Sequence, residues 1–401
     1  MALNIEQNCR EKGSDFTGKL VEWRRYLHQN PELGLEEINT QKFVMEKLRE
    51  MRVEHKPLTD TGVVAMIRGK EEGPVAAIRA DMDALPVHDE KNVPYKSKVP
   101  GKGHMCGHDA HTAMLLGAAG LLKENPPEKG SVKLIFQPAE EGRFGAEKMI
   151  KAGALENPSV DGIVALHVHP GVPAGKATIT DGAACAAADF FEVEIKGKGG
   201  HAAHPHQAVD PITAAAQVIS GIQQITSRQI DPLLPAVITI GQIHGGTADN
   251  VIPNSVRFGG TVRTMDTGLR DEMESKIESV VKGITEAFGA SYSLNYRYFF
   301  PSVVNDKRLL PVLEETAGEV LGEENLSYVK PSMGGEDFSF FTHRVPGLMF
   351  RLGVGNKEKG ITAPLHHPEF DLDETALPLG SEMLARFADK FLKINLRGEL
   401  T

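Results

Sequence analysis

Three short apolar runs in the first half of the chain have the character of strands that are buried on both faces of a sheet. They cover residues 75–81, 131–136 and 162–167. Segments of helical character lie between them, such as the run of small residues at 110–123. Strands that alternate with helices form parallel sheets with right-handed crossovers. We therefore expect an α/β fold whose central sheet is mostly parallel and flanked by helices.

Reactive side chains stand at the ends of these runs or just before the next helix. They are Asp81, Asp83, Cys106, His108, Glu140, Glu141 and His167. In parallel sheets, ligands bind beyond the carboxyl ends of the strands. We therefore expect all of these side chains on one rim of the sheet. A later loop at 365–368 contains His366, which could fold back to the same rim.

The residue types at this rim suit a pair of metal ions. Cysteine and histidine bind zinc and its first-row neighbours, and a carboxylate can bind one metal or bridge two. Neighbouring glutamates at the corner between a strand and a loop point in different directions. Glu141 can therefore bind metal while Glu140 takes a proton from water as a general base. The predicted ligands of this two-metal hydrolase centre are Cys106, His108, Glu141, His167 and His366.

Several other polar residues stand close to these ligands in the sequence. Asp83 suits the role of accepting a ring N–H from a ligand histidine. For Asp81, Asp109 and His111 the sequence does not distinguish such a supporting role from ordinary hydrogen bonding. Ordinary hydrogen bonding is expected for two neighbours of candidate ligands, His169 and His367.

From about residue 190 the pattern changes to strand, helix, strand, strand, helix, strand. The strands are expected at 190–196, 236–244, 255–265 and 291–299, and the helices at 210–228 and 269–288. This order is that of a ferredoxin-like α+β module. Residues 182–188 and 300–301 would be its hinges, which makes the module an insertion. We expect a catalytic domain in two parts, 1–186 and 301–401, and an inserted domain at 187–300.

Composition excludes several classes of protein. The 44 basic and 54 acidic side chains give a formal charge of −10, which argues against nucleic acid as a partner. No run reaches the roughly 18 to 20 apolar residues of a membrane span, and residues 1–15 lack the apolar core of a signal peptide. We therefore expect a cytoplasmic protein that binds no membrane. The cysteines, Cys9, Cys106 and Cys185, are too scattered for a disulfide framework, and only Cys106 has neighbours typical of a metal ligand.

Several motifs spread along the chain carry a resemblance to a known family. They are Arg25-Tyr-Leu-His28 with Pro31-Glu-Leu-Gly34, Arg79-Ala-Asp-Met-Asp-Ala-Leu-Pro86, His104-Met-Cys-Gly-His-Asp109, Gln137-Pro-Ala-Glu-Glu141, Leu166-His167, Gly199-Gly-His201, Asn250-Val-Ile-Pro253, Gly334-Gly-Glu-Asp-Phe338 and Leu365-His366. With these motifs the chain resembles, over essentially its whole length, the aminoacylase, hippurate-hydrolase and indole-acetyl-amino-acid-hydrolase family of metal-dependent amidohydrolases.

This resemblance implies a catalytic domain that holds two divalent metal ions, with Cys106 as the bridging ligand and Glu140 as the general base. Zinc and manganese are the first choices of metal, and nickel or cobalt are also compatible with such donors. The implied substrate is an N-acyl amino acid, with an N-acetyl, N-benzoyl or similar acyl group. Hydrolysis would release a carboxylate and a free amino acid.

The resemblance also implies that the inserted domain is a lid that often forms a homodimer. His201 would then donate to the oxyanion of the transition state, and Asn250 would approach the substrate. We further expect Arg263 or the loop at Gly334 and Gly335 to receive the substrate carboxylate, since an arginine fork fits a carboxylate.

Three alternatives stand beside this reading. The first is a metallo-carboxypeptidase or dipeptidase that acts on small peptides. The second is a thiol amidase in which Cys106 is the nucleophile and His108 or His111 its base, which would leave the two glutamates without a role. The third is a non-catalytic protein that binds metal or amino acids, against which Glu140 argues. The motifs do not select the acyl group, the amino-acid side chain or the metal.

Overall fold

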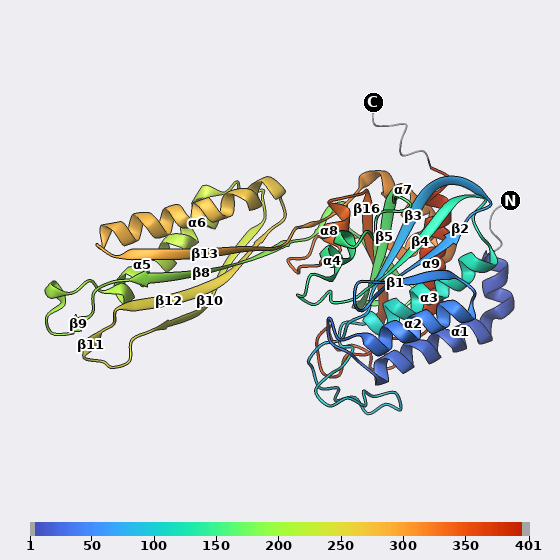
Figure 1. The fold of residues 1–401 in the computed structure, drawn as a ribbon, viewed down its shortest axis with the longest axis horizontal. Helices are drawn as coiled ribbons and strands as arrows, with labels where there is room; N and C mark the ends of the chain where they lie inside the picture. Colours follow the sequence, from blue (N-terminus) through green and yellow to red (C-terminus); the bar gives the residue numbers. More distant parts are fainter. Residues whose placement is uncertain (1–4, 395–401) are drawn as a thin grey trace. The chain divides into compact units, whose positions relative to one another are not determined.

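The computed structural model describes the backbone of residues 5–394 and the side chains of residues 15–394. The side chain of Cys9 therefore lies outside the described residues. The chain forms two compact units (Figure 1). The larger unit comprises the residues up to Ala184, Val304–Lys330 and the residues from Asp337 on, and the smaller unit comprises Cys185–Val303 and Pro331–Glu336.

The larger unit is built on one eight-stranded sheet. In spatial order its strands are β1 (Glu54–Leu58), β2 (Gly62–Arg68), β4 (Lys129–Gln137), β3 (Glu71–Asp81), β5 (Gly162–Pro173), β16 (Gly347–Gly355), β6 (Ala177–Ile179) and β15 (Leu326–Tyr328). The strands β4, β3, β5 and β16 are parallel to one another. The central pairs are parallel, as the sequence predicts, but β1–β2, β2–β4 and β6–β16 pair antiparallel, which the sequence did not predict. The sheet is therefore mixed. Only residues 59–61 join β1 to β2, and a connection this short cannot make the crossover that a parallel pair needs.

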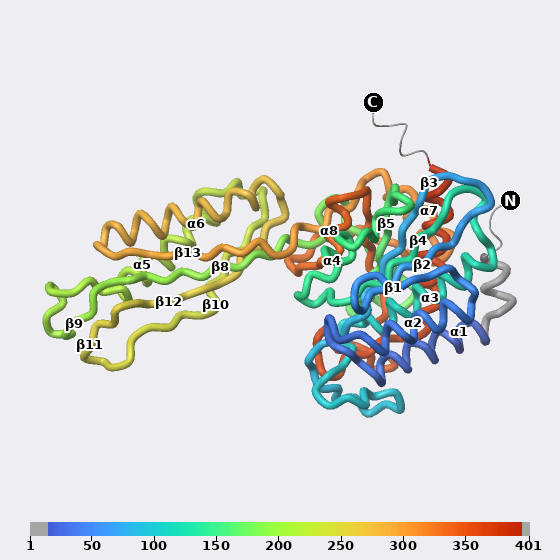
Figure 2. The backbone as a smooth tube through the Cα atoms, in the orientation of Figure 1, coloured from blue at the N-terminus to red at the C-terminus, as the bar shows by residue number. Residues whose placement is uncertain are grey.

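Helices cover this sheet and bury its apolar side chains. Those that bound the main core are α1 (Ile5–Gln29), α2 (Ile38–Glu50), α3 (His108–Glu124), α7 (Leu310–Val320) and α9 (Ala376–Phe391). The helices α3 and α9 contact β3 and β5, and α1 packs against both helices (Figure 2). Two shorter helices, α4 (Gly145–Lys151) and α8 (Ser339–Thr342), contact β4 and β16 respectively. Of the helices in the described part of the chain, none combines the length and the apolar character needed to cross a membrane.

The parallel strands bring their carboxyl ends to the same level of the sheet. Asp81 at the end of β3 is opposite Gln137 at the end of β4. Arg79 is opposite Ala165 of β5, so His167 lies two residues further along that strand. The prediction that β5 ends at His167 is wrong, because the strand continues to Pro173. His167 nevertheless lies beside the end of the neighbouring strand β3.

The smaller unit has the strand and helix order that the sequence predicts. Its elements are β8 (Ala187–Lys196), α5 (Pro211–Gln224), β10 (Ala236–Gly245), β12 (Ser255–Thr264), α6 (Thr267–Ala287) and β13 (Ser291–Phe300). The strands form an antiparallel sheet in the order β10-β12-β8-β13. A separate pair, β9 (Gly200–His201) with β11 (Val251–Ile252), lies beyond this sheet. Two further short strands, β7 (Gly182–Cys185) and β14 (Val303–Asn305), pair where the chain leaves and re-enters the larger unit.

Candidate metal centre

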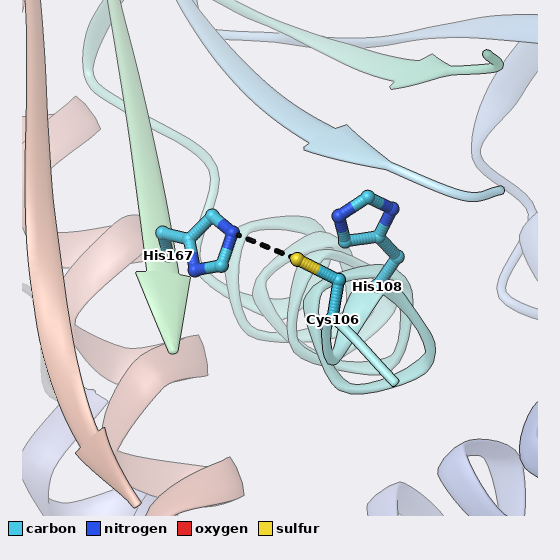
Figure 3. A group of neighbouring side chains, drawn as sticks. All are labelled: Cys106, His108 and His167. Carbon is cyan, nitrogen blue, oxygen red and sulfur yellow. Dashed lines mark hydrogen bonds between the residues drawn. The ribbon is translucent and has the colours of Figure 1, made fainter. Parts of the chain in front are cut away.

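The segment that carries Cys106 and His108 depends on the glycine between them. Gly107 precedes α3 with φ of +86°, a left-handed conformation that glycine adopts without strain. A methyl group at this position would lie 2.3 Å from Cγ2 of Val168. Because only glycine fits here, the chain can pass close to β5 and present the side chains of Cys106 and His108 together (Figure 3).

His167 faces the thiol of Cys106 from β5. Its Nδ1 lies 2.8 Å from the carbonyl oxygen of Val168, and its Nε2 lies 3.5 Å from Sγ of Cys106 (Figure 3). Since the carbonyl only accepts, Nδ1 carries the proton and the lone pair of Nε2 points to the thiol. Burial, together with the nearby His111, lowers the pKa of His167. The ring is therefore neutral, which is the form that binds metal.

Asp83 fixes the corner that carries the two glutamates. Its Oδ1 accepts the backbone N–H of Glu140 at 2.9 Å, and its Oδ2 accepts that of Glu141 at 3.0 Å. The same Oδ1 lies 3.3 Å from Nδ1 of His108. Asp83 therefore lies beside a candidate ligand histidine, where the sequence analysis expected it, and also holds the backbone of the glutamate corner.

His366 reaches the same cluster from the loop before α9. Its Nε2 lies 3.3 Å from Oε1 of Glu141. Its backbone N–H donates to the carbonyl oxygen of Met105 at 2.7 Å. Hydrogen bonds with Cys106 and Glu141 raise the pKa of His366 to about 10. The histidine therefore holds a positive charge in the absence of metal, at a place where the surrounding thiol and carboxylates favour a cation.

The five predicted ligands meet in overlapping groups. In each group the potential ligand atoms lie within 4.8 Å of one another, and the groups are Cys106 with His108 and His167, Cys106 with Glu141 and His366, and His108 with Glu140 and Glu141. The Nε2 atom of His108 is buried and has no hydrogen-bond partner among the described residues. A buried polar atom without a partner is costly, and coordination to a metal would satisfy it. The sulfur, imidazole and carboxylate donors fit two divalent ions.

Asp81 and His111 lie in the same region, but their polar atoms are already engaged. Asp81 Oδ1 lies 2.5 Å from Nδ1 of His111, and Asp81 Oδ2 accepts from Arg79 at 2.7 Å. The Nε2 atom of His111 accepts the backbone N–H of Val168 at 2.9 Å. These contacts favour a supporting role for both residues over metal ligation. Two histidines for which ordinary hydrogen bonding was expected, His169 and His367, each accept the backbone N–H of the residue two positions further along the chain.

A buried arginine, for which the sequence pattern predicted no role, joins these elements. Arg79 donates from Nε to Gln137 at 2.7 Å and from Nη2 to Asp337 at 3.0 Å. The backbone N–H of Asp337 in turn donates to Oε1 of Glu140 at 3.2 Å. An arginine inside the apolar run 75–81 was a visible signal of a buried ion pair. Its partner Asp337, 258 residues away, could not be identified from local pattern.

In the smaller unit, His201 and Asn250 lie together on the β9–β11 pair. His201 is opposite Val251, and the carbonyl oxygen of Asn250 accepts the N–H of Ala202 at 3.1 Å. The Nδ1 atom of His201 accepts the N–H of Ala203 at 3.0 Å. The proton of the neutral ring is therefore on Nε2, which is left as an exposed donor.

Arg263 and Gly335 also lie together within the smaller unit. A methyl group on Gly335 would be 3.3 Å from Nη1 of Arg263, and the carbonyl oxygen of Gly334 accepts the N–H of Ala186 at 3.1 Å. Arg263 is half-buried in β12, and among the described residues no hydrogen bond or ion pair engages its guanidinium. The carboxylate of Asp189 acts on Arg263 only through its charge, so the donors of the guanidinium can still bind an anionic ligand.

The fold and the donor cluster together define an α/β protein with a candidate site for two metal ions. Comparison with known proteins then shows the family to which the chain belongs. The model of peptidase family M20/M25/M40 matches residues 77–390, and the chain belongs to this family.

Relatives of known name are similar over most of their length. The chain is 43% identical to the IAA-amino acid hydrolase ILR1-like 4 of Arabidopsis thaliana, with 95% of this chain and 87% of the relative covered. It is 42% identical to an N-acetylcysteine deacetylase of Bacillus subtilis, with 93% and 97% covered. The crystal structure of the YXEP protein of Bacillus subtilis, described as a dinuclear metal binding peptidase of the M20 family, superimposes with a TM-score of 0.84. It is 37% identical, and the match covers 94% of this chain and 99% of that one.

The contacts of Asp83 generate a first prediction. In Asp83→Asn one carboxylate oxygen becomes an NH2 group, so the backbone N–H of Glu140 or Glu141 faces a donor instead of an acceptor. We expect the affinity for zinc to fall roughly tenfold to hundredfold, as for other residues that orient ligands. Competition with a chromophoric chelator measures this affinity. Asp161→Asn is the control, because Asp161 also accepts a backbone N–H, that of Val75 at 2.8 Å, away from the ligands. Equal affinities in the two variants would contradict the role of Asp83.

A second prediction concerns Glu37, which supports the same corner. Its Oε1 accepts the N–H of Ala139 at 2.7 Å, and burial together with the nearby Asp83 raises its pKa to about 7. A carboxyl with a raised pKa stabilises the folded state at acid pH, and this contribution is lost as pH rises from about 4.5 to about 7. Glu37→Gln stays neutral. As pH rises through this range, the free energy of unfolding of Glu37→Gln should therefore increase relative to that of the wild type, by at most about 3 kcal/mol.

Urea titrations of the metal-free proteins at several pH values test this. Glu36→Gln serves as the matched neighbour, because Glu36 is exposed and its hydrogen bond with Lys102 lowers its pKa. The Glu36 variant should show a small change of opposite sign. A constant difference between Glu37→Gln and the wild type at all pH values would show that folding leaves the pKa of Glu37 unchanged.

Proposed function

We propose that the protein hydrolyses the amide bond of N-acyl amino acids to release a carboxylate and a free amino acid. The observation that carries this proposal is the division between two adjacent carboxylates. Both glutamates share a donor group with His108, but only Glu141 also lies with His366 and Cys106, whereas the carboxylate of Glu140 accepts the N–H of Asp337 at 3.2 Å. One glutamate is thus placed to bind metal and its neighbour is held as a proton acceptor.

The ligands of two divalent ions would be Cys106, His108, Glu141, His167 and His366, with zinc or manganese as the first candidates. When bound, such ions act as Lewis acids and make a nucleophile available from water near neutral pH. Cys106 is the residue common to the groups that contain His167 and His366, which supports its proposed position between the two ions.

Glu140 would take the proton of the attacking water and then hand it to the leaving amine. Two features of the chain favour this role. The backbone of Glu140 is held by Asp83 at 2.9 Å, and its carboxylate is buried beside Asp337. A proton acceptor with a fixed position can serve both transfers without a large rearrangement.

The smaller unit would supply the remaining substrate contacts. We propose that the exposed Nε2–H of His201 stabilises the oxyanion and that Arg263 binds the carboxylate of the amino acid. Asn250 and the loop of Gly334 and Gly335, which lie beside these two residues respectively, would complete the binding surface.

The names of two relatives agree with this class of substrate, since IAA-amino acids and N-acetylcysteine are both acylated amino acids. A peptidase is the second candidate, because the similar YXEP protein is described as a dinuclear metal binding peptidase. A thiol amidase is disfavoured by the surroundings of Cys106. Burial raises the pKa of this thiol, whereas a nucleophilic cysteine needs a lowered pKa.

A hydrolysis panel tests these candidates directly. Metal-free protein is reloaded with zinc or manganese and offered N-acetyl, N-benzoyl and indole-acetyl amino acids beside the matching dipeptides. We expect metal-dependent release of the free amino acid from one or more N-acyl substrates and slower cleavage of dipeptides. Preferential cleavage of dipeptides would favour the peptidase, and full activity in the presence of excess chelator would favour the thiol amidase.

A third prediction separates the two glutamates. Glu140→Gln keeps the five ligands and should retain both metals, but it should lose roughly a hundredfold or more in kcat because the proton acceptor is gone. Glu141→Gln is the matched control, which should instead lose metal. Metal content and kcat are measured on the same preparations. A Glu140→Gln protein that loses metal, or that turns over at the rate of the wild type, would exclude Glu140 as the base.

A fourth prediction concerns His201 and the proposed homodimer. His201→Ala should retain metal and lower kcat much more than it changes KM, the sign of an interaction made mainly in the transition state. We propose that the smaller unit forms the dimer contact, since its edge strand β10 exposes the apolar Val237 and Ile243. If His201 acts on the partner's site, mixing His201→Ala with Glu140→Gln subunits should restore activity, because each hybrid dimer would contain one intact site. Unchanged kcat in His201→Ala would remove this residue from the chemistry.

A further inference from the structure

A second buried polar cluster in the larger unit contains no candidate ligand. Its centre is Arg24 in α1, whose side chain is 0% exposed. The Nε group of Arg24 donates to Oδ2 of Asp109 at 2.9 Å, and the same oxygen lies 2.7 Å from Nδ1 of His28. The other ring nitrogen of His28 lies 3.2 Å from Asp89. None of these residues enters the proposed chemistry, yet a fully buried guanidinium is retained only where its partners are well placed.

The partners of Arg24 belong to the two segments that carry candidate ligands. Asp109 follows His108 directly at the start of α3. The Nη2 group of Arg24 donates to Asp371 at 2.9 Å, and Nη1 donates to Glu374 at 3.2 Å. Asp371 and Glu374 lie on the chain that runs from His366 to α9. One side chain of α1 therefore holds both the segment of His108 and the segment of His366.

The segment of His366 needs such an external hold because it has little regular structure of its own. Residues 362–375 contain no strand and no helix. His366 itself has φ of +67°, a left-handed conformation that is unfavourable for a residue with a side chain. Its backbone is fixed by the hydrogen bond to Met105 at 2.7 Å, and that of Pro368 by the N–H of Glu90 at 3.0 Å. Ordering each loop residue costs backbone entropy, which specific contacts must offset.

Further contacts at Asp371 stabilise the position of this segment. The hydroxyl of Tyr95 donates to Asp371 Oδ2 at 2.7 Å, while Arg24 engages Oδ1. The guanidinium of Arg24 also lies over the ring of Tyr95, 4.8 Å from its centre. Burial disfavours a charge on Arg24, but the carboxylates of Asp109, Asp371 and Glu374 outweigh this and raise its pKa. Arg24 is therefore a permanent cation between the two segments.

We propose that Arg24 is a positioning residue of the metal centre, which sets the spacing between the ligands of the Cys106–His108 segment and His366 through Asp109 and Asp371. The inference rests on the proposed ligand set. It differs from a general role in stability because it makes the affinity for metal, and not only the folding of the chain, depend on Arg24.

The test compares two adjacent arginines of α1. Arg24→Lys keeps the charge but cannot reach Asp109, Asp371 and Glu374 together, because an ammonium lacks the planar fork of the guanidinium. We expect its metal-free form to fold, as judged by circular dichroism, and to bind zinc roughly tenfold to hundredfold more weakly in chelator competition. Arg25→Ala is the matched control. Arg25 also contacts Glu374, at 2.9 Å and 2.6 Å, and lies over Tyr95, but among the described residues it has no hydrogen bond to Asp109 or Asp371.

A second variant keeps the inference testable if the protein does not fold after Arg24 is replaced. Asp371→Asn leaves Arg24 and Asp109 paired and weakens only the connection to the segment of His366. We expect it to weaken zinc binding as well, and the double variant with Arg24→Lys should lose less than the product of the two single effects. If Arg24→Lys does not fold, the zinc affinity of Asp371→Asn decides the matter.

Zinc affinity equal to that of the wild type in folded Arg24→Lys or in Asp371→Asn would overturn the inference, even if the variant unfolds at a lower temperature. An equal loss in Arg25→Ala would also overturn it, because the effect would then come from Glu374 or Tyr95 alone. Failure of the proposed function has a separate signature. A wild-type protein that binds two metals but hydrolyses no N-acyl amino acid would refute the function and leave the role of Arg24 intact.

Discussion

One buried guanidinium joins the chain segments on which the candidate metal centre depends. Arg79 lies in β3 and is 1% exposed. Its Nη1 and Nη2 groups donate to Asp81 at 2.7 Å and to Asp337 at 3.0 Å. Removing such an ion from water costs several kcal/mol, which only partners in good geometry offset. The ends of β3 and β4 and the chain near Asp337 must therefore keep their relative positions, because any separation would leave a buried charge without compensation.

This constraint reaches both the ligands and the proposed base through the backbone. On one side, Asp81 holds His111, whose other nitrogen accepts the N–H of Val168, the residue after His167. On the other side, the N–H of Asp337 contacts the carboxylate of Glu140 at 3.2 Å. Arg79, which is neither a candidate ligand nor the proposed base, thus helps to orient the candidate ligand His167 and the proposed base Glu140.

Sequence reasoning could place the candidate ligands because their positions follow from local pattern. Alternation of strands and helices put Asp81 and Glu140 at neighbouring strand ends, and the register of Asp81 opposite Gln137 agrees with that logic. The antiparallel edges were missed, since three residues between β1 and β2 are a weak signal in a chain rich in loops. The distant partners of Arg79 and Arg24 could not be predicted. Their partners lie up to 258 and 350 residues away, and no periodicity links an arginine to a particular distant carboxylate.

The two halves of the donor set are held by different physical means. His167 belongs to a strand with neighbours on both sides, and a backbone carbonyl fixes its ring at 2.8 Å. His366 belongs to a loop in a left-handed conformation, which side-chain ion pairs and a few backbone hydrogen bonds hold in place. Displacing a strand residue would disturb two ladders of hydrogen bonds, whereas displacing the loop would stretch only a few contacts. A difference in preferred bond length between zinc and manganese would therefore be absorbed at His366 rather than in the sheet. The donors themselves, more than their spacing, would then select the metal.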